Sequence, residues 1–219
     1  AVAKAAELVR SYDDDTAGQV YDLETAGDQF EDELGDYLSK LSGKELTDQQ
    51  GRYAAVYLHS LSDFERITDH ARNIAENAAE IHDKKLTFSE AARKELQVME
   101  QAVLEIIRLT LDAFLNENVP EARNVEPLEE VIDDLSDEMK MRHVDRLQQG
   151  ECTIANGFVF NDLVTNYERI SDHCSNIALA IIEMHASSLA GHEYIGNMKS
   201  KHQPDFERKY EEYRKQFSL

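Results

Sequence analysis

Cysteine, proline and glycine are scarce in this chain, and the shortage of cysteine excludes two kinds of site. The 219 residues contain only two cysteines, Cys152 and Cys174, and no C-x-x-C pair. Neither a disulfide framework nor a zinc site built from thiolates is therefore expected, and a reducing compartment is favoured. No apolar run approaches the roughly 18 residues that a membrane span needs, and no secretory signal is recognisable. These residues are expected to be soluble, without direct insertion into a membrane.

Positive charge is also in short supply. The chain has 44 acidic residues against 23 lysines and arginines, which gives a formal net charge of −21. Such a charge repels nucleic-acid phosphates and anionic lipid headgroups. Since no local basic patch interrupts it, nucleic acid is not an expected partner.

Sequence motifs of common enzymes are missing as well. The chain lacks H-E-x-x-H, G-x-x-x-x-G-K-[ST], G-x-G-x-x-G and G-x-S-x-G, the signatures of metalloproteases, nucleotide-binding proteins and hydrolases. Ferritin-like di-iron oxidases need E-x-x-H on a helix, and none of the eight histidines follows a glutamate at that spacing. The sequence therefore predicts a protein that is not an enzyme.

What is abundant is Ala, Glu, Leu, Asp and Lys, which favours an all-α fold. Gly, Pro, Asn and polar clusters end helices, and they predict six helices and a C-terminal helical tail. The expected breaks are Ser42-Gly43, 83–87, 116–120, Gly150 and Ala190-Gly191. Ser89 followed by Glu90 is typical of a helix N-cap with an acidic first turn, and this helix is expected to run to about Leu115.

An internal repeat organises the chain. D-F-E-R-I-T-D-H-A-R-N-I-A at 63–75 matches N-Y-E-R-I-S-D-H-C-S-N-I-A at 166–178, and L-E-T-A-G-D at 23–28 matches L-E-E-V-I-D at 128–133. The repeat predicts two antiparallel three-helix bundles, at 1–84 and 85–189, followed by the tail at 190–219. The second copy begins near Ser89, and its counterpart in the first copy would begin before Ala1. We therefore expect the chain to be part of a longer protein.

Each repeat carries E-x-x-x-D, which stacks two carboxylates on one helix face. One interpretation is a solvated face, because Glu65 and Asp69 lie nearly opposite the apolar stripe of their helix. The stripe consists of Ile67, Ala71, Ile74, Ala78 and Ile81. Repetition of Glu, Arg, Asp, His and Asn in both copies favours the other interpretation, an engaged face. Carboxylates from neighbouring helices suit iron, manganese, magnesium or calcium, and zinc also accepts them.

Other repeated side chains have supporting roles in this hypothesis. Arg66 and Arg169 either brace a carboxylate or form surface ion pairs. His70 and His173 point away from the E-x-x-x-D face, so we expect them to be packed or to support ligands rather than to bind metal. The aromatic stripe of the tail is typical of helix packing.

At E-R-I-T-D-H-A-R-N-I-A and E-R-I-S-D-H-C-S-N-I-A the sequence resembles the PhoU family over residues 1 to about 187. The resemblance implies two similar three-helix bundles with metal-binding motifs. It places them at Glu24, Asp28, Glu65, Asp69, Glu129, Asp133, Glu168 and Asp172. Iron, zinc or manganese would be the metals, with magnesium also compatible. The first copy has Gly27 where the second has Ile132, and glycine in a helix costs about 1 kcal/mol, which weakens the expectation for Glu24 and Asp28.

Residues 142–153, the E-Y-I stretch and the aromatic tail are similar to the cytoplasmic PhoU-like domain at the C-terminus of bacterial sodium/phosphate cotransporter-family proteins. PhoU proteins are negative regulators of phosphate uptake and of the phosphate-sensing two-component system. The resemblance thus implies regulation without turnover at the inner face of the membrane, as part of a longer membrane protein. The partners would be a transporter's transmembrane domain or phosphate-signalling proteins, and a homodimer is compatible with this role.

Two other functions remain open from the sequence. One is a carboxylate-rich iron-binding or storage protein, which would turn over bound iron with oxygen. The other is a helical adaptor that binds no metal and acts through its surface.

Overall fold

The fold is a long bundle of antiparallel helices. The computed structural model describes residues 1–185 and 204–219, and its ordered elements there are helices without strands, which confirms the all-α prediction. The helices are α1 (Val2–Arg10), α2 (Asp14–Ser42), α3 (Asp48–Asp83), α4 (Glu90–Asn116), α5 (Val119–Ala122), α6 (Val125–Gln148), α7 (Ile154–His185) and α9 (Pro204–Gln216).

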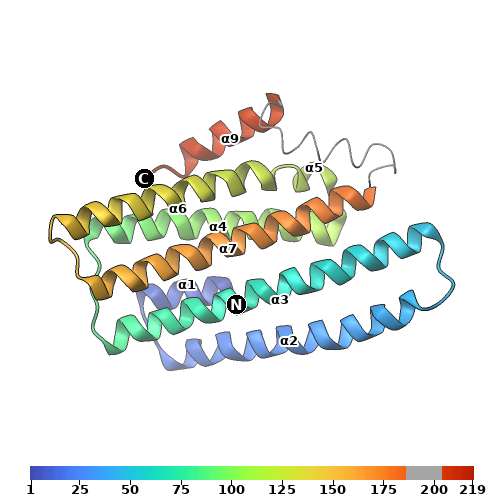
Figure 1. Ribbon diagram of the computed structural model, residues 1–219, viewed down its shortest axis with the longest axis horizontal. Helices are drawn as coiled ribbons and strands as arrows, with labels where there is room; N and C mark the ends of the chain where they lie inside the picture. Colours follow the sequence, from blue (N-terminus) through green and yellow to red (C-terminus); the bar gives the residue numbers. More distant parts are fainter. Residues whose placement is uncertain (186–203) are drawn as a thin grey trace.

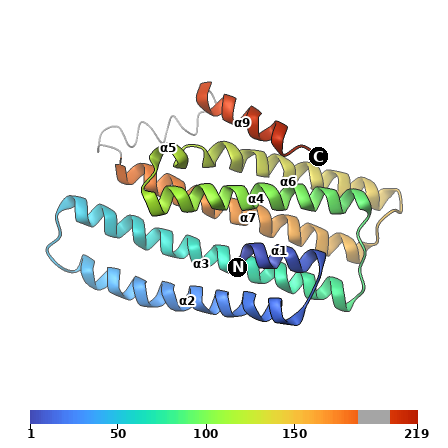
Figure 2. The same ribbon diagram turned by 180° about the vertical axis from the view of Figure 1, so that it is seen from behind.

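The helices group as the repeat requires. α1, α2 and α3 pack on one another, as do α4, α6 and α7, and α3 packs along α7 to join the two groups (Figure 1). The view from behind shows α1 and α4 on the same side of the molecule, α1 in front of α3 and α4 in front of α7 (Figure 2). α3 and α7 therefore form the centre of the molecule. The exact ends proposed for the two bundles stay a prediction.

Local sequence signals explain most helix ends. The Ser89 side chain accepts a hydrogen bond from the Ala92 N–H at 3.2 Å and caps α4, which ends at Asn116, one residue beyond the expected end. Thr47 and Gln50 form a capping box at the start of α3. After α6, Gly150 has a φ of +73°, a backbone conformation that glycine adopts without steric cost.

Two interruptions were not expected from the sequence. Residues 11–13 separate α1 from α2, and the Asp13 carboxylate accepts a hydrogen bond from the Thr16 N–H at 2.8 Å. α5 begins inside the break expected at 116–120 and ends two residues beyond it, with Asn118 as its N-cap. Both depend on a polar side chain that caps the next helix rather than on glycine. The expected break at Ala190-Gly191 and the boundary at 189/190 lie outside the described residues.

The short helix α9 packs on α6. Tyr213 and Phe217 are buried in this contact, so the aromatic stripe expected in the tail does pack against the bundle. None of the helices within residues 1–185 and 204–219 combines the length and apolar character needed to cross a membrane.

Candidate metal centres

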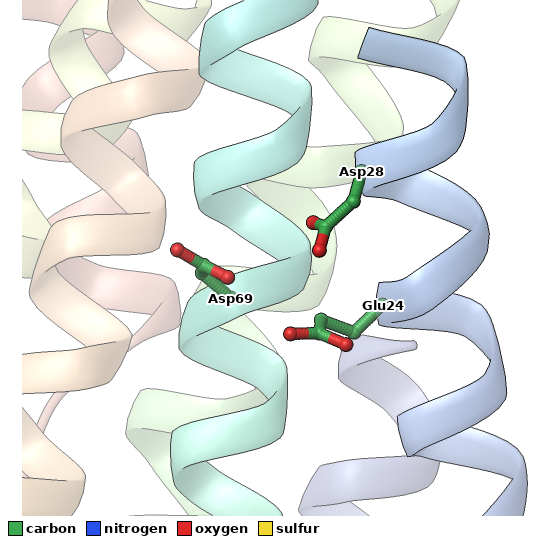
Figure 3. A group of neighbouring side chains, drawn as sticks. All are labelled: Glu24, Asp28 and Asp69. Atoms are coloured by element: carbon green, nitrogen blue, oxygen red, sulfur yellow. The ribbon is translucent and has the colours of Figure 1, made fainter. Parts of the chain in front are cut away.

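Six of the eight predicted metal-binding residues come together in two clusters. Glu24 and Asp28 on α2 face Asp69 on α3, and in each cluster one oxygen per residue lies within 4.8 Å of the others (Figure 3). The second cluster repeats this arrangement between α6 and α7. It consists of Glu129, Asp133 and Asp172. Glu65 and Glu168 precede Asp69 and Asp172 by one helical turn and belong to neither cluster.

The close approach of α2 to α3 explains the glycine in the first repeat. A Cβ atom at Gly27 would lie only 2.6 Å from the Thr68 Oγ1, which is shorter than a non-bonded contact allows. The absence of a side chain lets the two helices come near each other and brings Asp28 towards Asp69. Gly27, expected from helix propensity to weaken this site, is thus part of the packing that forms it.

In the second cluster the carboxylates are crowded and poorly solvated. Burial raises the pKa of Glu129 to about 8, and the nearby charge of Asp133 adds to the shift. Burial also raises the pKa of Asp133 to about 6, together with the charges of Asp172 and Glu168. Both groups thus hold protons well above their ordinary range, because burial and the neighbouring negative charges disfavour their ionised forms.

In the first cluster an arginine side chain offsets part of the negative charge. Glu24 is 5% exposed, and the Arg72 Nη1 donates a hydrogen bond of 2.7 Å to its Oε1. Burial and the charges of Glu24 and Asp69 raise the pKa of Asp28. Burial and the Asp69 charge raise the pKa of the adjacent Glu65 to about 7.

The expectation of a solvated face is wrong for Glu65. The apolar stripe is confirmed, since Ile67, Ala71, Ile74 and Ala78 are buried, yet the Glu65 side chain on the other face is only 12% exposed. Periodicity within α3 locates its core-facing stripe, but it carries no information about α2, which covers part of the second face.

The repeated arginines brace the clusters in the same way. Arg66 Nη1 lies 3.3 Å from Asp69 Oδ2, and Arg169 Nη1 lies 2.8 Å from Asp172 Oδ2. Each arginine thus lies beside the aspartate that its own helix contributes to the cluster.

The repeated histidines serve a different purpose, as expected. His70 and His173 stack with their ring centroids 5.6 Å apart where α3 meets α7. His70 Nδ1 lies 2.8 Å from Asn166 Oδ1, and His173 Nδ1 lies 2.9 Å from Asp63 Oδ1. Asp63 and Asn166 are matched positions of the repeat, so the contact is reciprocal and joins the two bundles.

Three residues at the clusters were not anticipated. Arg72 pairs with Glu24, while Lys140 Nζ donates to Glu168 Oε2 at 2.7 Å and Ser136 donates to the same oxygen. Neither arginine nor lysine is repeated at these positions, so a search for repeated residues does not find them. Arg72 and Lys140 each reach a carboxylate on a different helix, so the sequence carries no local signal for these pairs.

The donor set fits hard metal ions. Each cluster offers three carboxylates from two helices, and oxygen donors suit magnesium, manganese and iron, with zinc also acceptable. The raised pKa values of Glu129 and Asp133 come from burial first and from the neighbouring carboxylates second. A bound cation would favour the ionised forms of these groups.

A comparison with known protein families identifies the fold. The PhoU domain matches residues 1–78 and 96–181, one match for each repeat. The chain belongs to the PhoU family. Both PhoU matches contain a complete carboxylate cluster, which supports the division of the chain into two similar units.

Individual relatives agree with this assignment. A PhoU homologue of Thermotoga maritima, named a phosphate-specific transport system accessory protein, is 28% identical over 61% of this chain and 57% of its own length. The chain thus matches less than two thirds of that relative. A PhoU homologue of Deinococcus radiodurans with the same kind of name is 25% identical over 80% of this chain and 81% of its own length.

Solved structures show the same fold. PhoU from Pseudomonas aeruginosa has a TM-score of 0.78 and 22% identity, covering 84% of this chain and 87% of its own. The phosphate transport system regulatory protein PhoU from Streptococcus pneumoniae has a TM-score of 0.74 and 20% identity, covering 84% of this chain and 86% of its own. At 22% and 20% sequence identity, these similarities show a shared fold alone.

Proposed function

We propose that this PhoU-family chain regulates phosphate uptake without catalysis, and that metal ions bound at its two carboxylate clusters hold it in the regulatory conformation. The relatives' names describe accessory and regulatory proteins of phosphate transport, which supports the general role. The observation that carries the metal hypothesis is the pair of matched three-carboxylate clusters.

We further propose that the chain acts at the cytoplasmic face of the membrane as the regulatory part of a sodium/phosphate cotransporter. The support for this finer assignment is the sequence likeness at residues 142–153. Its partner would be the transmembrane domain of that transporter or a phosphate-signalling protein. Iron, zinc and manganese are the preferred metals for the clusters because all three accept carboxylate ligands, and magnesium is compatible for the same reason.

Thermal unfolding tests the metal hypothesis. Metal that binds only the native state at a hundredfold excess over Kd stabilises it by about 2.7 kcal/mol, so manganese or zinc should raise the Tm of the chelator-treated protein. Replacing Asp28→Asn and Asp133→Asn together should remove most of that rise, because each cluster loses one charged ligand. Replacing Glu211→Gln and Glu212→Gln in α9 provides the matched control, and it should leave the rise intact.

The outcome also separates the competing functions. If iron, manganese, zinc and magnesium all leave the Tm unchanged, the metal hypothesis is wrong and a metal-free adaptor is favoured. Bound iron that turns over with oxygen would favour storage or redox chemistry instead. For the regulatory role, cells that express the cotransporter should take up phosphate faster with the Asp28→Asn/Asp133→Asn variant than with the unmodified chain. Equal uptake would contradict regulation through these clusters.

A further inference from the structure

The turn between α6 and α7, at one end of the molecule (Figure 1), lies next to two buried ionisable side chains that the first bundle replaces with leucine. In the alignment of α2 with α6 that the repeat gives, Leu38 stands at the position of His143, and Leu41 stands at the position of Arg146. His143 is only 6% exposed and Arg146 only 8%. Burial of such groups costs free energy unless they find partners, so their surroundings decide how they behave.

Arg146 has a strong partner in the neighbouring helix. Its two terminal nitrogens each donate a hydrogen bond of 2.8 Å to the Glu95 carboxylate of α4, and its guanidinium lies 5.3 Å from the centre of the Phe160 ring. Arg142 Nη1 lies 3.7 Å from the same carboxylate. Because Glu95 is already paired with two arginines, it gives little stabilisation to a proton on His143.

The imidazole of His143 lacks a comparable partner. Among the residues that the structure describes, its buried Nε2 has no hydrogen bond, and a Cβ atom at Gly157 of α7 would lie only 2.7 Å from this nitrogen. Its Nδ1 lies 4.0 Å from the Cys152 Sγ, a weak partner whose own hydrogen goes to the Thr153 carbonyl. The ring stacks on Phe160 with the centroids 5.0 Å apart. Stacking and close packing thus suit the neutral imidazole better than the imidazolium.

Protonation of His143 is therefore unfavourable while the turn is closed. Burial lowers the pKa of His143 and the Arg146 charge lowers it further, whereas the Glu95 charge has a smaller, opposite effect. The Cys152 thiol does not compete for the proton, since burial raises its pKa. In an open turn the imidazole would regain water, and its pKa would return towards the ordinary 6.5. A base with a lower pKa in the closed form favours that form at high pH and the open form at low pH.

The segment that can open is short. The Glu151 N–H donates a hydrogen bond of 2.9 Å to the Arg146 carbonyl and closes the turn onto α6. The start of α7 is fastened separately, because Asn156 Nδ2 donates to the Thr87 carbonyl at 2.7 Å. Opening would thus be confined to residues 149–153, which include Cys152.

We propose that the α6–α7 turn is a pH-sensitive switch, in which protonation of His143 displaces Cys152 and opens this end of the second bundle at acidic pH. The charged and titratable groups that face His143 are Arg146 of its own helix, Glu95 of α4 and Cys152 of the turn. The first bundle, with leucine at the matched position, should not respond. The switch does not rest on the proposed metal binding, because none of its residues belongs to a carboxylate cluster.

Amide hydrogen exchange of the full chain tests the proposal. With a chelator present, the opening constant at the Glu151 amide should rise as the pH falls from 7 to 5, by up to tenfold per pH unit, because opening takes up one proton. The rates are first corrected for the intrinsic dependence of exchange on pH. The Lys44 amide donates to the Leu41 carbonyl in the matched turn between α2 and α3, and its opening constant should not change.

Variants assign the response to a single side chain. His143→Leu gives the turn the residue of the first bundle and should make opening at Glu151 independent of pH. His143→Gln stays polar without ionising and should have the same effect, so the test does not depend on the folding of one variant. His59→Leu, at an exposed position of α3, is the control and should retain the response of the unmodified chain.

Two results would overturn the switch. One is an opening constant at Glu151 that stays the same between pH 7 and pH 5 in the unmodified chain. The other is a pH dependence that persists in both His143 variants, which would assign it to a carboxylate such as Glu95. Neither result bears on metal binding, so the two proposals are tested separately.

Discussion

At the scale of single residues, burial decides how each carboxylate behaves. The chain has 44 acidic side chains, and most of those on exposed helix faces need only water or a nearby lysine. Glu129 differs because burial raises its pKa to about 8 and the Asp133 charge adds to the effect. A group that is neutral in the folded protein and charged in the unfolded chain makes stability depend on pH.

The raised pKa of Glu129 determines whether stability rises or falls with pH. Between its ordinary value of 4.5 and about 8, folded Glu129 holds a proton that the unfolded chain has lost. The free energy of unfolding of the metal-free protein should therefore fall as the pH rises through this window, and level off above it. Asp133, with a pKa raised to about 6, contributes the same trend at lower pH.

Glu129→Gln should remove the fall in the free energy of unfolding between pH 6 and pH 8, because glutamine cannot ionise. At pH 8.5 we expect the variant to be more stable than the unmodified protein by about 1–2 kcal/mol, allowing for solvent screening of a partly exposed group. Urea unfolding with a chelator at the two pH values measures this difference. Asp145→Asn, at an exposed position of α6, is the control and should retain the fall. A Gln variant that loses stability in parallel with the unmodified protein would contradict this origin of the pH dependence.

At the scale of helices, the distance between α2 and α3 determines whether the first cluster forms. Two glycines in α2 allow this to be tested within a single helix. A Cβ atom at Gly18 would meet nothing within 4 Å, whereas at Gly27 it would lie 2.6 Å from Thr68 Oγ1. The intrinsic helix preference for alanine is the same at both positions, so any difference comes from packing.

Gly18→Ala should stabilise the protein by about 0.5–1 kcal/mol because alanine is the better helix former. Gly27→Ala should give no such gain, since Thr68 or α2 must move, and it should weaken metal binding at the first cluster. Combining Gly27→Ala with Thr68→Ala should recover the gain, because the clash is removed. Chemical denaturation measures all four proteins. Equal stabilisation by the two single alanine substitutions would show that α2 and α3 are not closely packed at Gly27.

At the scale of the whole molecule, the contact between α3 and α7 joins the two bundles. His70 and His173 stack across it, and each ring is hydrogen-bonded to the other helix at Asn166 or Asp63. The repeat thus places two sets of residues on each central helix. One set faces the carboxylate cluster of its own bundle, and the other faces the opposite bundle.

Replacing His70→Ala and His173→Ala together should lower the free energy of unfolding by about 2 kcal/mol, which is the order expected for two partly buried hydrogen bonds. The number of bound Mn²⁺ ions should stay the same, because neither histidine belongs to a cluster. Denaturation and a titration with MnCl₂ measure the two effects. His59→Ala, at an exposed position of α3, should change stability by less than about 0.5 kcal/mol. Loss of an ion in the double variant would show that a histidine is a ligand after all.

The sequence by itself determined the class of fold, most helix boundaries and the motifs that form the clusters. The α4 cap at Ser89 and the end of α6 before Gly150 depend on a few neighbouring residues, and so does the apolar stripe of α3. Such features follow from local propensity and from the period of the helix. The repeat was visible for a related reason, since both copies keep matching side chains in the same order.

Only the tertiary structure decided which of the matched carboxylates come together and which cations reach them. Asp69 and Asp172 join clusters while Glu65 and Glu168, one turn away, do not. The role of Gly27 depends on Thr68 of another helix, and that of Lys140 depends on Glu168. These contacts are set by the distance and rotation between packed helices, and the periodicity of a single helix contains neither quantity.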